Sequence, residues 1–402
     1  MDIVYADNNA TTAVAPEVVE AMMPFLTGEF FNPSSMYERA RGVSEALEAA
    51  RRTVARTLGA RDPSQILFTG SATEANSTAL LGAIKANPNR RHVITSGVEH
   101  PSVFELAKDL ERQGMEVTFV PVDRQGRIDV RSFIRSLRPD TLLVSLMHAN
   151  NETGVIFPIQ QLARLTKETD PAILFHTDAT QSVGKLEIDL DGPFANVDLL
   201  SFSGHKLHAP KGVGVLFLRK GVRVRPFILG GHQESGRRAG TENMPYIVGL
   251  ARACELAVEH LDDEVTRVRK LRDRLEAALV ASIPHVEING QGAARLPNTL
   301  NLACHYIEGE GMLFQLDAHG VCASSGSACT SGSLEPSHVL RAMGVPFTAV
   351  HGSVRFSLSR YSSDGDVDRI IAVFPGIVDS LRRLSPYWDI AANAPRPDAP
   401  SV

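Results

Sequence analysis

The chain has 402 residues, of which 43% are hydrophobic and 22% charged, the balance of an ordinary soluble globular protein with room for two domains. Its net charge of -5, with both signs interspersed, gives no indication of a nucleic-acid partner, and its apolar runs are too short to cross a bilayer. The N-terminal stretch MDIVYADNNATT lacks a basic and apolar leader pattern, so we expect a cytoplasmic protein.

From residue 16 to residue 220, short apolar segments alternate with amphipathic helical patterns. Near-continuous apolar strands joined by helices indicate a mostly parallel sheet with helices on both faces, which predicts an α/β fold. The predicted strands are QILFTG (65–70), HVITS (92–96), EVTFVPV (116–122), TLLVSLM (141–147), AILFHTDA (172–179), DLLSFSGH (198–205) and GVGVLFLR (212–219).

The segment 242–282 has helical spacing and alternating charge signs, which predicts one long helical stretch. After residue 295 the pattern becomes a compact α+β unit, in which the strands TLNLACHY and GSVRFSLSR alternate with three helical patterns. We therefore predict a large domain over 16–260, a small α+β domain made of 1–15 and 261–390, and a disordered tail over 391–402, which is rich in Pro and Ala.

Four cysteines occur, and one of them lies in an unusual place. Cys254 and Cys304 stand in helical and strand patterns, where we expect buried packing residues, and no cysteine pair has zinc-site spacing. Cys329 instead lies in SSGSACTSGS (324–333), a stretch of small polar residues that predicts a loop. A disulfide with Cys322 is disfavoured in a reducing cytosol, so we interpret Cys329 as a free, reachable thiol.

Polar residues follow the C-terminal ends of several predicted strands. Because ligands bind beyond the carboxyl ends of strands in open parallel sheets, these residues form the candidate site. Ser71 and Thr73 open a helix after the first strand, where free backbone N–H groups suit a phosphate. The later strands are followed by His100, Asn150, Asn151, Asp178, Gln181, Ser203, His205 and Lys206.

Each of these residues alone has an ordinary structural explanation as a helix cap, a turn residue or a surface lysine. Together they place phosphate-binding donors, an acid, an imidazole and a lysine at one edge of one sheet. Pyridoxal phosphate (PLP) needs this set: a site for its phosphate, an acid for its pyridinium nitrogen and a lysine for its aldehyde. No G-x-G-x-x-G or H-E-x-x-H motif is present, so dinucleotide and zinc sites are weaker hypotheses.

A resemblance to a known family runs from about Tyr5 to Trp388 and is carried by ten motifs. They are DNNATT, NPSS, TEAN, EHPSV, NNETG, HTDATQSVGK, SFSGHKLHAPKGVG, RRAGTEN, SSGSACTSGSLEPSHVL and VRFSLSR. In order and spacing they resemble the PLP-dependent cysteine desulfurases of the NifS/IscS type. The wording of GHKLHAPKGVG, GGHQESGRRAGTEN and LSPYW is most similar to the nitrogen-fixation branch, NifS.

The resemblance implies a fold-type-I PLP enzyme, a homodimer whose cofactor lies near the subunit interface. It assigns the cofactor's lysine to Lys206 rather than to Lys211, which stands in a Pro-Lys-Gly turn. It further implies that Thr241 reaches the cofactor's phosphate from the partner subunit. The phosphate-binding residues within one subunit are Ala72, through its backbone, and Thr73, Ser203 and His205.

The resemblance also assigns the contacts to the cofactor's ring and to the substrate. Asp178 pairs with the pyridinium nitrogen, Gln181 binds the ring hydroxyl, and His100 stacks on the ring. Asn151 and Arg355 hold the substrate carboxylate, for which the planar fork of an arginine fits better than lysine would. Asn151 also contacts the cofactor, and Asn32 assists with the substrate.

The implied reaction converts L-cysteine to L-alanine and moves the sulfur, through a persulfide on Cys329, to an iron-sulfur scaffold or another acceptor protein for nitrogenase maturation. Lys206 takes the Cα proton and His100 assists proton movements. A thiol that both attacks the substrate's sulfur and delivers it elsewhere needs a mobile tether, which explains the position of Cys329. We expect no intrinsic metal site, although Cys329 is a candidate transient ligand of an iron-sulfur cluster, and no nucleic-acid or membrane partner.

Other functions remain open at this point. A housekeeping IscS-type desulfurase, a selenocysteine lyase and a transaminase are alternatives among PLP enzymes, although transamination does not need a mobile cysteine. The Pro/Ala-rich tail lacks the histidine-bearing end of IscS proteins. A different class is a non-PLP thiol enzyme that pairs Cys329 with His338 or His351, or a non-catalytic sulfur carrier.

Overall fold

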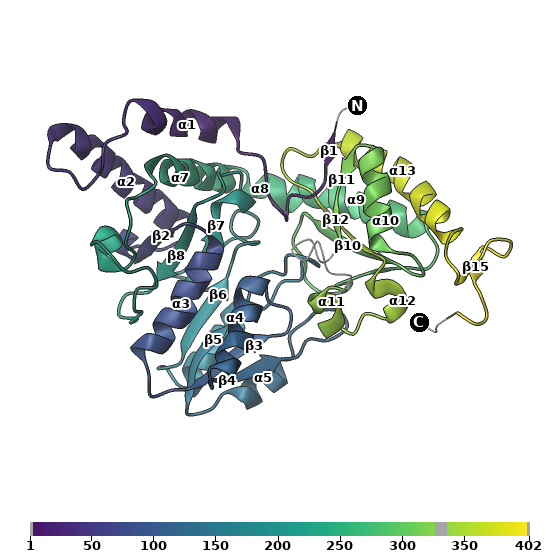
Figure 1. The fold of residues 1–402 in the computed structure, drawn as a ribbon, viewed down its shortest axis with the longest axis horizontal. Helices are drawn as coiled ribbons and strands as arrows, with labels where there is room; N and C mark the ends of the chain where they lie inside the picture. Colours follow the sequence, from purple (N-terminus) through teal and green to yellow (C-terminus); the bar gives the residue numbers. More distant parts are fainter. Residues whose placement is uncertain (1–2, 326–335, 400–402) are drawn as a thin grey trace.

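The structure, a computed structural model, describes residues 3–325 and 336–399. It has two halves that lie side by side (Figure 1). A seven-stranded sheet forms the centre of the larger half. In spatial order its strands are β2 (Ile66–Thr69), β8 (Gly214–Leu218), β7 (Leu199–Ser203), β6 (Leu174–Asp178), β5 (Thr141–Ser145), β3 (His92–Ser96) and β4 (Glu116–Val120). The five strands β3 to β7 are mutually parallel, and only β8 runs antiparallel to both its neighbours. The predicted α/β fold class is confirmed.

Helices cover both faces of this sheet. They are α1 (Pro16–Thr27), α2 (Glu38–Thr57), α3 (Ala72–Ala86), α4 (Pro101–Arg112), α5 (Val130–Ser136), α6 (Ile159–Thr169) and α7 (Met244–Glu259), with 3₁₀ turns at η1 (Pro63–Gln65), η2 (Gly204–Lys206) and η3 (Gln233–Gly236). Apolar side chains of α3 and α4 pack on one face of the sheet, and those of α6 and α7 pack on the other. Because both faces are covered, every residue of β2, β3, β5, β7 and β8 is buried. None of the helices in the described ranges is long and apolar enough to span a membrane.

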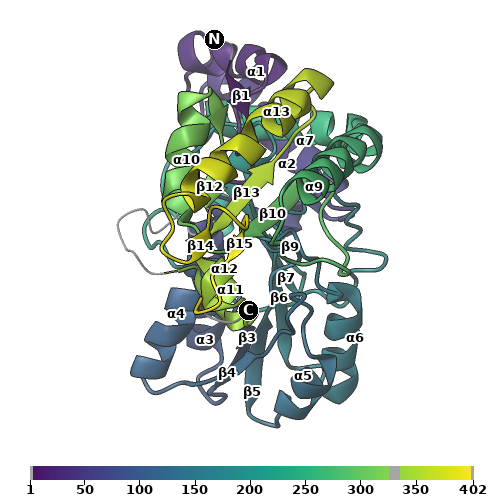
Figure 2. The ribbon, with the colours of Figure 1, turned by 90° about the vertical axis from the view of Figure 1, so that its right-hand side faces the viewer.

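The smaller half contains a four-stranded antiparallel sheet with helices packed against it (Figure 2). Its strands, in spatial order, are β12 (Ser324–Ser325), β13 (Ser353–Ser357), β10 (Thr299–Cys304) and β9 (Val286–Ile288). Its helices are α9 (Arg269–Ser282), α10 (Gly309–Ala318), α11 (His338–Ala342), α12 (Phe347–Val350) and α13 (Asp364–Arg382). At the start of the chain, β1 (Val4–Tyr5) pairs with β11 (Val321–Cys322), so the N-terminus belongs to this half.

The predicted helical stretch over 242–282 is interrupted once. Helix α7 ends at Glu259, and His260 leaves the helical conformation before α8 (Leu261–Asp263), the π-helical turn η4 (Glu264–Val268) and α9 continue. The interruption lies between two cores, since α7 packs into the core of the larger half and α9 into that of the smaller one. These separate cores support the division into 16–260 and 1–15 with 261–390, which we propose as domains, although α11 and α12 pack on the larger core.

Part of the C-terminal segment for which composition predicts disorder forms a short strand pair. Strand β14 (Trp388–Asp389) forms a short hairpin with β15 (Ala394–Pro395). Trp388 is buried, and the guanidinium of Arg382 lies over its ring at 4.4 Å. The packed Trp388 anchors the start of the hairpin. This contact could not be predicted from the Pro/Ala-rich composition of the residues that follow it.

We expect Gly214→Ala to lower the free energy of unfolding by about 1–3 kcal/mol, the usual effect of overpacking. A Cβ at Gly214 would stand 2.5 Å from the carbonyl carbon of Ser71 and 2.9 Å from the backbone nitrogen of Ala72, so the backbone must shift. Chemical denaturation measures the change. The control is Gly376→Ala in α13, where nothing lies within 4 Å of the added Cβ and a helical alanine is neutral or stabilising. Equal stability of the two variants would contradict this role for Gly214.

Candidate active site

A cavity of about 700 Å³ opens at the C-terminal ends of the parallel strands. It is lined by most of the residues that the sequence predicts for the site, namely Ala72, Thr73, His100, Asn151, Asp178, Gln181, Ser203, His205, Lys206 and Arg355. Arg355 comes from β13 of the smaller half, so the cavity lies between the two halves. Asn32 and Thr241 are exposed and do not line it, and Cys329 lies outside the described residues.

Lys206 lies in the turn η2, directly after the buried strand β7. Its Nζ donates hydrogen bonds to the backbone carbonyl oxygens of Asn9 and Ala10, both at 2.6 Å. Lys211, the other lysine of the same segment, is exposed and does not line the cavity. Of the two lysines, Lys206 is therefore the one whose amine a ligand in the cavity meets.

A buried lysine, Lys185, supports the segment behind the cavity. Lys185 Nζ donates to the backbone carbonyl of Gln181 at 3.2 Å and to that of Lys206 at 3.5 Å. Burial lowers the pKa of Lys185 to about 8, and the charge of Glu264 opposes this shift. Two segments that contribute side chains to the cavity are thus held together by one ammonium group.

The start of α3 provides an anion-binding corner. Ser71 caps the helix by accepting the Glu74 N–H, and the amides of Ala72 and Thr73 belong to the first turn, where helical N–H groups lack intrahelical acceptors. Strand register places Gly214 between Thr69 and Ser203, which brings Ser203 next to this corner.

His205 also lines the cavity, and its Nδ1 lies 3.1 Å from the Thr11 hydroxyl. Burial lowers the pKa of His205 to about 4, with a further contribution from the charge of Lys206. The imidazole is therefore neutral at pH 7 and offers a hydrogen bond rather than a charge.

Asp178 ends β6 and is held in a fixed orientation. Its Oδ2 accepts a hydrogen bond from Asn76 Nδ2 at 2.8 Å, and its Oδ1 accepts one from the Thr180 backbone N–H at 2.9 Å. The Asn76 side chain also donates to the Ser102 hydroxyl, next to His100. Sequence analysis did not assign a role to Asn76, although it is the last residue of the TEAN motif.

Arg355 is positioned by two partners. Its Nη1 donates to the backbone carbonyl of Asn151 at 2.9 Å, and its Nη2 donates to Asp7 at 2.8 Å. Four buried polar atoms of cavity residues have no hydrogen-bond partner among the described residues: Asn151 Oδ1, Thr180 Oγ1, Gln181 Oε1 and Arg355 Nε. A buried polar atom without a partner costs about 1–3 kcal/mol, so the cavity suits a ligand with several polar groups. A lysine, an acid, an anion corner and these atoms together fit PLP and a carboxylate substrate.

The residues that line the cavity include two more that sequence analysis left without a role, Asn9 and Glu152. Asn9 belongs to DNNATT and Glu152 to NNETG, two of the motifs that carry the family resemblance. Burial raises the pKa of Glu152 to about 7, and its Oε2 accepts a hydrogen bond from the Ser337 hydroxyl at 2.5 Å. The motifs signalled these residues, but their contacts lie far away in the sequence.

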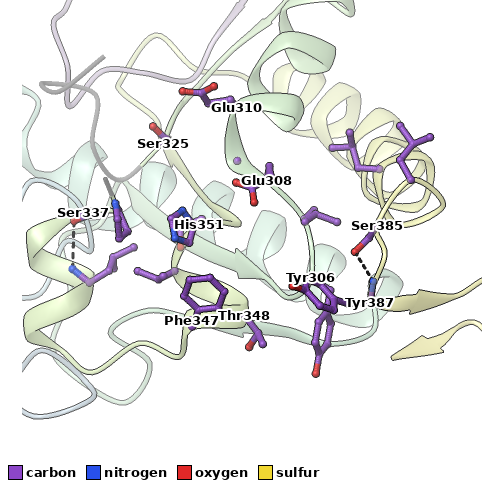
Figure 3. A pocket seen from close by; sticks show the side chains of 18 of the residues that line it. Tyr306, Glu308, Glu310, Ser325, Ser337, Phe347, Thr348, His351, Ser385 and Tyr387 are labelled. Carbon is purple, nitrogen blue, oxygen red and sulfur yellow. Dashed lines mark hydrogen bonds between the residues drawn. The ribbon is translucent and has the colours of Figure 1, made fainter. Parts of the chain in front are cut away.

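A second cavity of about 760 Å³ lies in the smaller half (Figure 3). The aromatic side chains of Tyr306, Phe347 and Tyr387 border it, with Glu308 and Glu310 on another side. It contains neither a lysine nor an arginine among its described lining residues. Among these described residues it therefore has no amine to react with an aldehyde and no guanidinium to bind a carboxylate.

Comparison with known proteins agrees with this geometry. A family model described as "Aminotransferase class-V" matches residues 4–370. The chain belongs to the aminotransferase class-V family. It is accordingly a PLP-dependent enzyme with the fold-type-I architecture.

Relatives within the family are similar over nearly the whole chain. The cysteine desulfurase NifS of Azotobacter vinelandii is 53% identical over 395 residues, which cover 98% of this chain and 97% of that protein. A cysteine desulfurase of Gluconacetobacter diazotrophicus is 52% identical over 402 residues, covering all of both chains. A solved structure of a NifS-like protein superposes with a TM-score of 0.88 at 38% identity, covering 94% of this chain and all of that one.

A buried glutamate beside the site predicts a pH dependence of stability. Glu99 accepts hydrogen bonds from the Ser96 hydroxyl and the Met147 N–H, and burial raises its pKa to about 8 from an ordinary value of 4.5. The folded state thus keeps a proton that the unfolded state loses. The stabilisation is complete below pH 4.5 and is lost as the pH rises towards 8, by at most about 1.4 kcal/mol per pH unit.

We expect Glu99→Gln, which cannot ionise, to gain stability relative to the wild type as the pH rises through this window. Urea denaturation between about pH 5 and pH 8.5 measures the difference in free energy of unfolding. Glu111→Gln, at an exposed position on α4, is the control and should give a curve parallel to the wild type. A parallel curve for Glu99→Gln as well would mean that Glu99 is ionised in the folded protein.

Proposed function

We propose that the protein is a cysteine desulfurase that converts L-cysteine to L-alanine and passes the sulfur, as a persulfide of Cys329, to an acceptor protein for iron-sulfur cluster assembly. The observation that carries the proposal is the cavity in which Lys206, Asp178 and Arg355 meet, in a chain about half identical to cysteine desulfurases over nearly its full length. The resemblance to the nitrogen-fixation branch supports a role in nitrogenase maturation, in the cytoplasm.

The side chains around the cavity have distinct tasks in this proposal. Ala72, Thr73, Ser203 and His205 hold the phosphate of PLP, Asp178 pairs with its ring nitrogen, and Gln181 binds its ring hydroxyl. When bound, PLP withdraws the electrons that are released as the Cα–H bond of the amino acid breaks. Lys206 provides the amine for the aldehyde of PLP and takes the Cα proton.

The substrate carboxylate binds to Arg355 and Asn151. The Nε of Arg355 is buried without a partner among the described residues and can donate to this carboxylate, and Asn151 can donate through its side-chain Nδ2. Asp7 and the Asn151 carbonyl fix the plane of the guanidinium before the substrate arrives, which reduces the entropy lost on binding. His100, beside Asp178, assists proton movements.

Sulfur leaves the substrate by transfer to a thiol of the protein. In the net reaction, L-cysteine and the Cys329 thiol give L-alanine and the Cys329 persulfide. The carbon–sulfur bond of the substrate breaks, and a sulfur–sulfur bond forms. The thiol is the nucleophile only when deprotonated. Because Cys329 lies outside the described residues, its role rests on the sequence and on the chemistry that the reaction needs.

We also propose a homodimer. The segments that contain Asn32 and Thr241 both border a hollow of about 530 Å³ on the larger half, with Ser34 from one and Glu242 from the other among its lining residues. Large apolar side chains are exposed in these segments, among them Phe30, Met36 and Leu229. A second copy that covers this face would bury them and bring Asn32 and Thr241 to the partner's cavity.

The acceptor protein, in this proposal, docks at the second cavity. Its wall includes Ser325 and Pro336, the residues on either side of the segment that contains Cys329. Phe347 is 70% exposed there and offers an apolar anchor point for a partner, while Glu308 and Glu310 favour a partner with basic residues (Figure 3).

We expect two variants to fail at different steps. Lys206→Ala should abolish alanine formation and the absorbance that borohydride bleaches, because no amine remains to react with PLP. Cys329→Ala should keep that absorbance and bind L-cysteine, but release no sulfur. Alanine and sulfide are measured with a reductant present, beside absorbance spectra. Alanine production by Cys329→Ala at the wild-type rate would refute the nucleophile, and production by Lys206→Ala would refute the lysine.

For the acceptor site, we expect Phe347→Asp to slow transfer of labelled sulfur to an acceptor protein by about tenfold or more, since buried aromatic anchors dominate interface energies. Alanine formation with a small-molecule reductant should stay unchanged, because Phe347 does not line the active-site cavity. The matched control is Phe314→Asp, an equally exposed phenylalanine (75%) that does not line the second cavity. Normal transfer by Phe347→Asp would place the acceptor elsewhere.

A further inference from the structure

A second imidazole lines the same cavity as His100. His338 is the first residue of α11, and its ring stacks on that of Phe104, with centroids 4.6 Å apart and an angle of 21° between the planes. The Nε2 atom of His338 lies 2.9 Å from the backbone carbonyl oxygen of Glu99. One ring face and one nitrogen are thus held by the protein, and Nδ1 has no hydrogen-bond partner among the described residues.

The hydrogen bonds fix both imidazoles in the tautomer with a protonated Nε2, but they leave a different nitrogen of each ring unengaged. A carbonyl oxygen only accepts, so Nε2 of His338 carries the proton and Nδ1 has the lone pair. At His100 the Ser102 backbone N–H donates to Nδ1, at 3.2 Å, so there Nδ1 has the lone pair and Nε2 carries the proton. His100 thus offers the cavity a proton donor, and His338 offers it a proton acceptor.

The surroundings keep His338 neutral. Burial lowers its pKa below the ordinary 6.5, and the hydrogen bond to Glu99 opposes this shift. The charges around it come from Lys108 and Glu105 on α4 and from Arg341 on its own helix; the two cations lower the pKa and the glutamate raises it. Burial lowers the pKa of His100, and the charge of a protonated His338 adds a smaller lowering effect.

We propose that His338 is a catalytic base of the desulfuration, which accepts the proton of a thiol at Nδ1 inside the cavity. This inference rests on the proposed function. The proposal follows from geometry. Nδ1 of His338 is an acceptor without a partner among the described residues, whereas the nitrogen that His100 leaves unengaged, Nε2, is a donor. A reaction that needs a thiolate needs such an acceptor, because a free cysteine thiol is mostly protonated at pH 7.

In this step the S–H bond breaks, its electron pair stays on sulfur, and a new N–H bond forms at Nδ1. The products are a thiolate and an imidazolium, so charge and atoms balance, and the proton later passes to water. Two thiols have the required chemistry, that of the substrate L-cysteine and that of Cys329. The experiment below distinguishes them.

The tautomer is tested directly on the wild-type holoenzyme by nitrogen-15 NMR of labelled histidines, with the His338 signals assigned by their loss in His338→Gln. We expect a protonated Nε2 and an unprotonated Nδ1 at pH 7. A protonated Nδ1, or an imidazolium at this pH, would overturn the proposal without any measurement of activity.

Two variants separate chemistry from structure. His338→Gln keeps an amide N–H that reaches the Glu99 carbonyl but has no base, and His338→Ala loses both. A catalytic base predicts that both lower kcat by about 100-fold or more and lose the acidic limb of the pH profile below about pH 6.5. A structural role predicts that His338→Gln behaves like the wild type. Melting temperature and PLP content report whether either variant is misfolded.

A further experiment shows which thiol gives its proton to His338. It measures how fast iodoacetamide alkylates Cys329 as a function of pH, without substrate and in a Cys322→Ser background. If His338→Gln slows alkylation at pH 7, the proton comes from Cys329. If alkylation is unchanged but kcat/KM loses its acidic limb, the proton comes from the substrate. No change in either measurement overturns the proposal. A wild-type enzyme that makes no alanine would refute the desulfurase function instead, while the tautomer and alkylation still test His338.

Discussion

One buried asparagine beside the cavity is hydrogen-bonded to both halves of the molecule. Asn9 is 1% exposed, and its amide and backbone groups all have partners. From the smaller half these partners are Asn298, Thr299 and Ser357, and from the larger half they are Asn151, Gln181 and Lys206. Since the lysine comes from one half and Arg355 from the other, the separation of these two groups depends on this hydrogen-bonded link.

Burial also determines which groups in the site carry charge. The imidazoles of His100 and His205 have lowered pKa values because they are removed from water, and so are neutral near pH 7. The same effect raises the pKa of the carboxyl of Glu152. Fewer ionised groups then compete with a bound carboxylate for the guanidinium of Arg355 and with a bound phosphate for the hydrogen-bond donors at the start of α3. Protein walls of low dielectric constant strengthen these remaining attractions relative to bulk water.

The sequence predicted most of the fold and the edge of the sheet at which the site lies. Strand periodicity is a local signal, and the seven strands of the large sheet all appear within the predicted segments. Asn76 and Asn9 were not assigned because their partners are distant: Asn76 bonds to Asp178, 102 residues away, and Asn9 to Thr299, 290 residues away. Local patterns report the type of an element, whereas these contacts depend on how the elements are assembled.

The two cavities meet at the residues that follow the segment with Cys329. Pro336 and Ser337 line both cavities, and Ser337 is fixed there by its hydrogen bond to the buried Glu152. On the other side, Ser325 lines the second cavity and is only four residues from Cys329, a span of at most roughly 14 Å. The ends of the segment are therefore held at the wall between the site of sulfur removal and the proposed site of sulfur delivery.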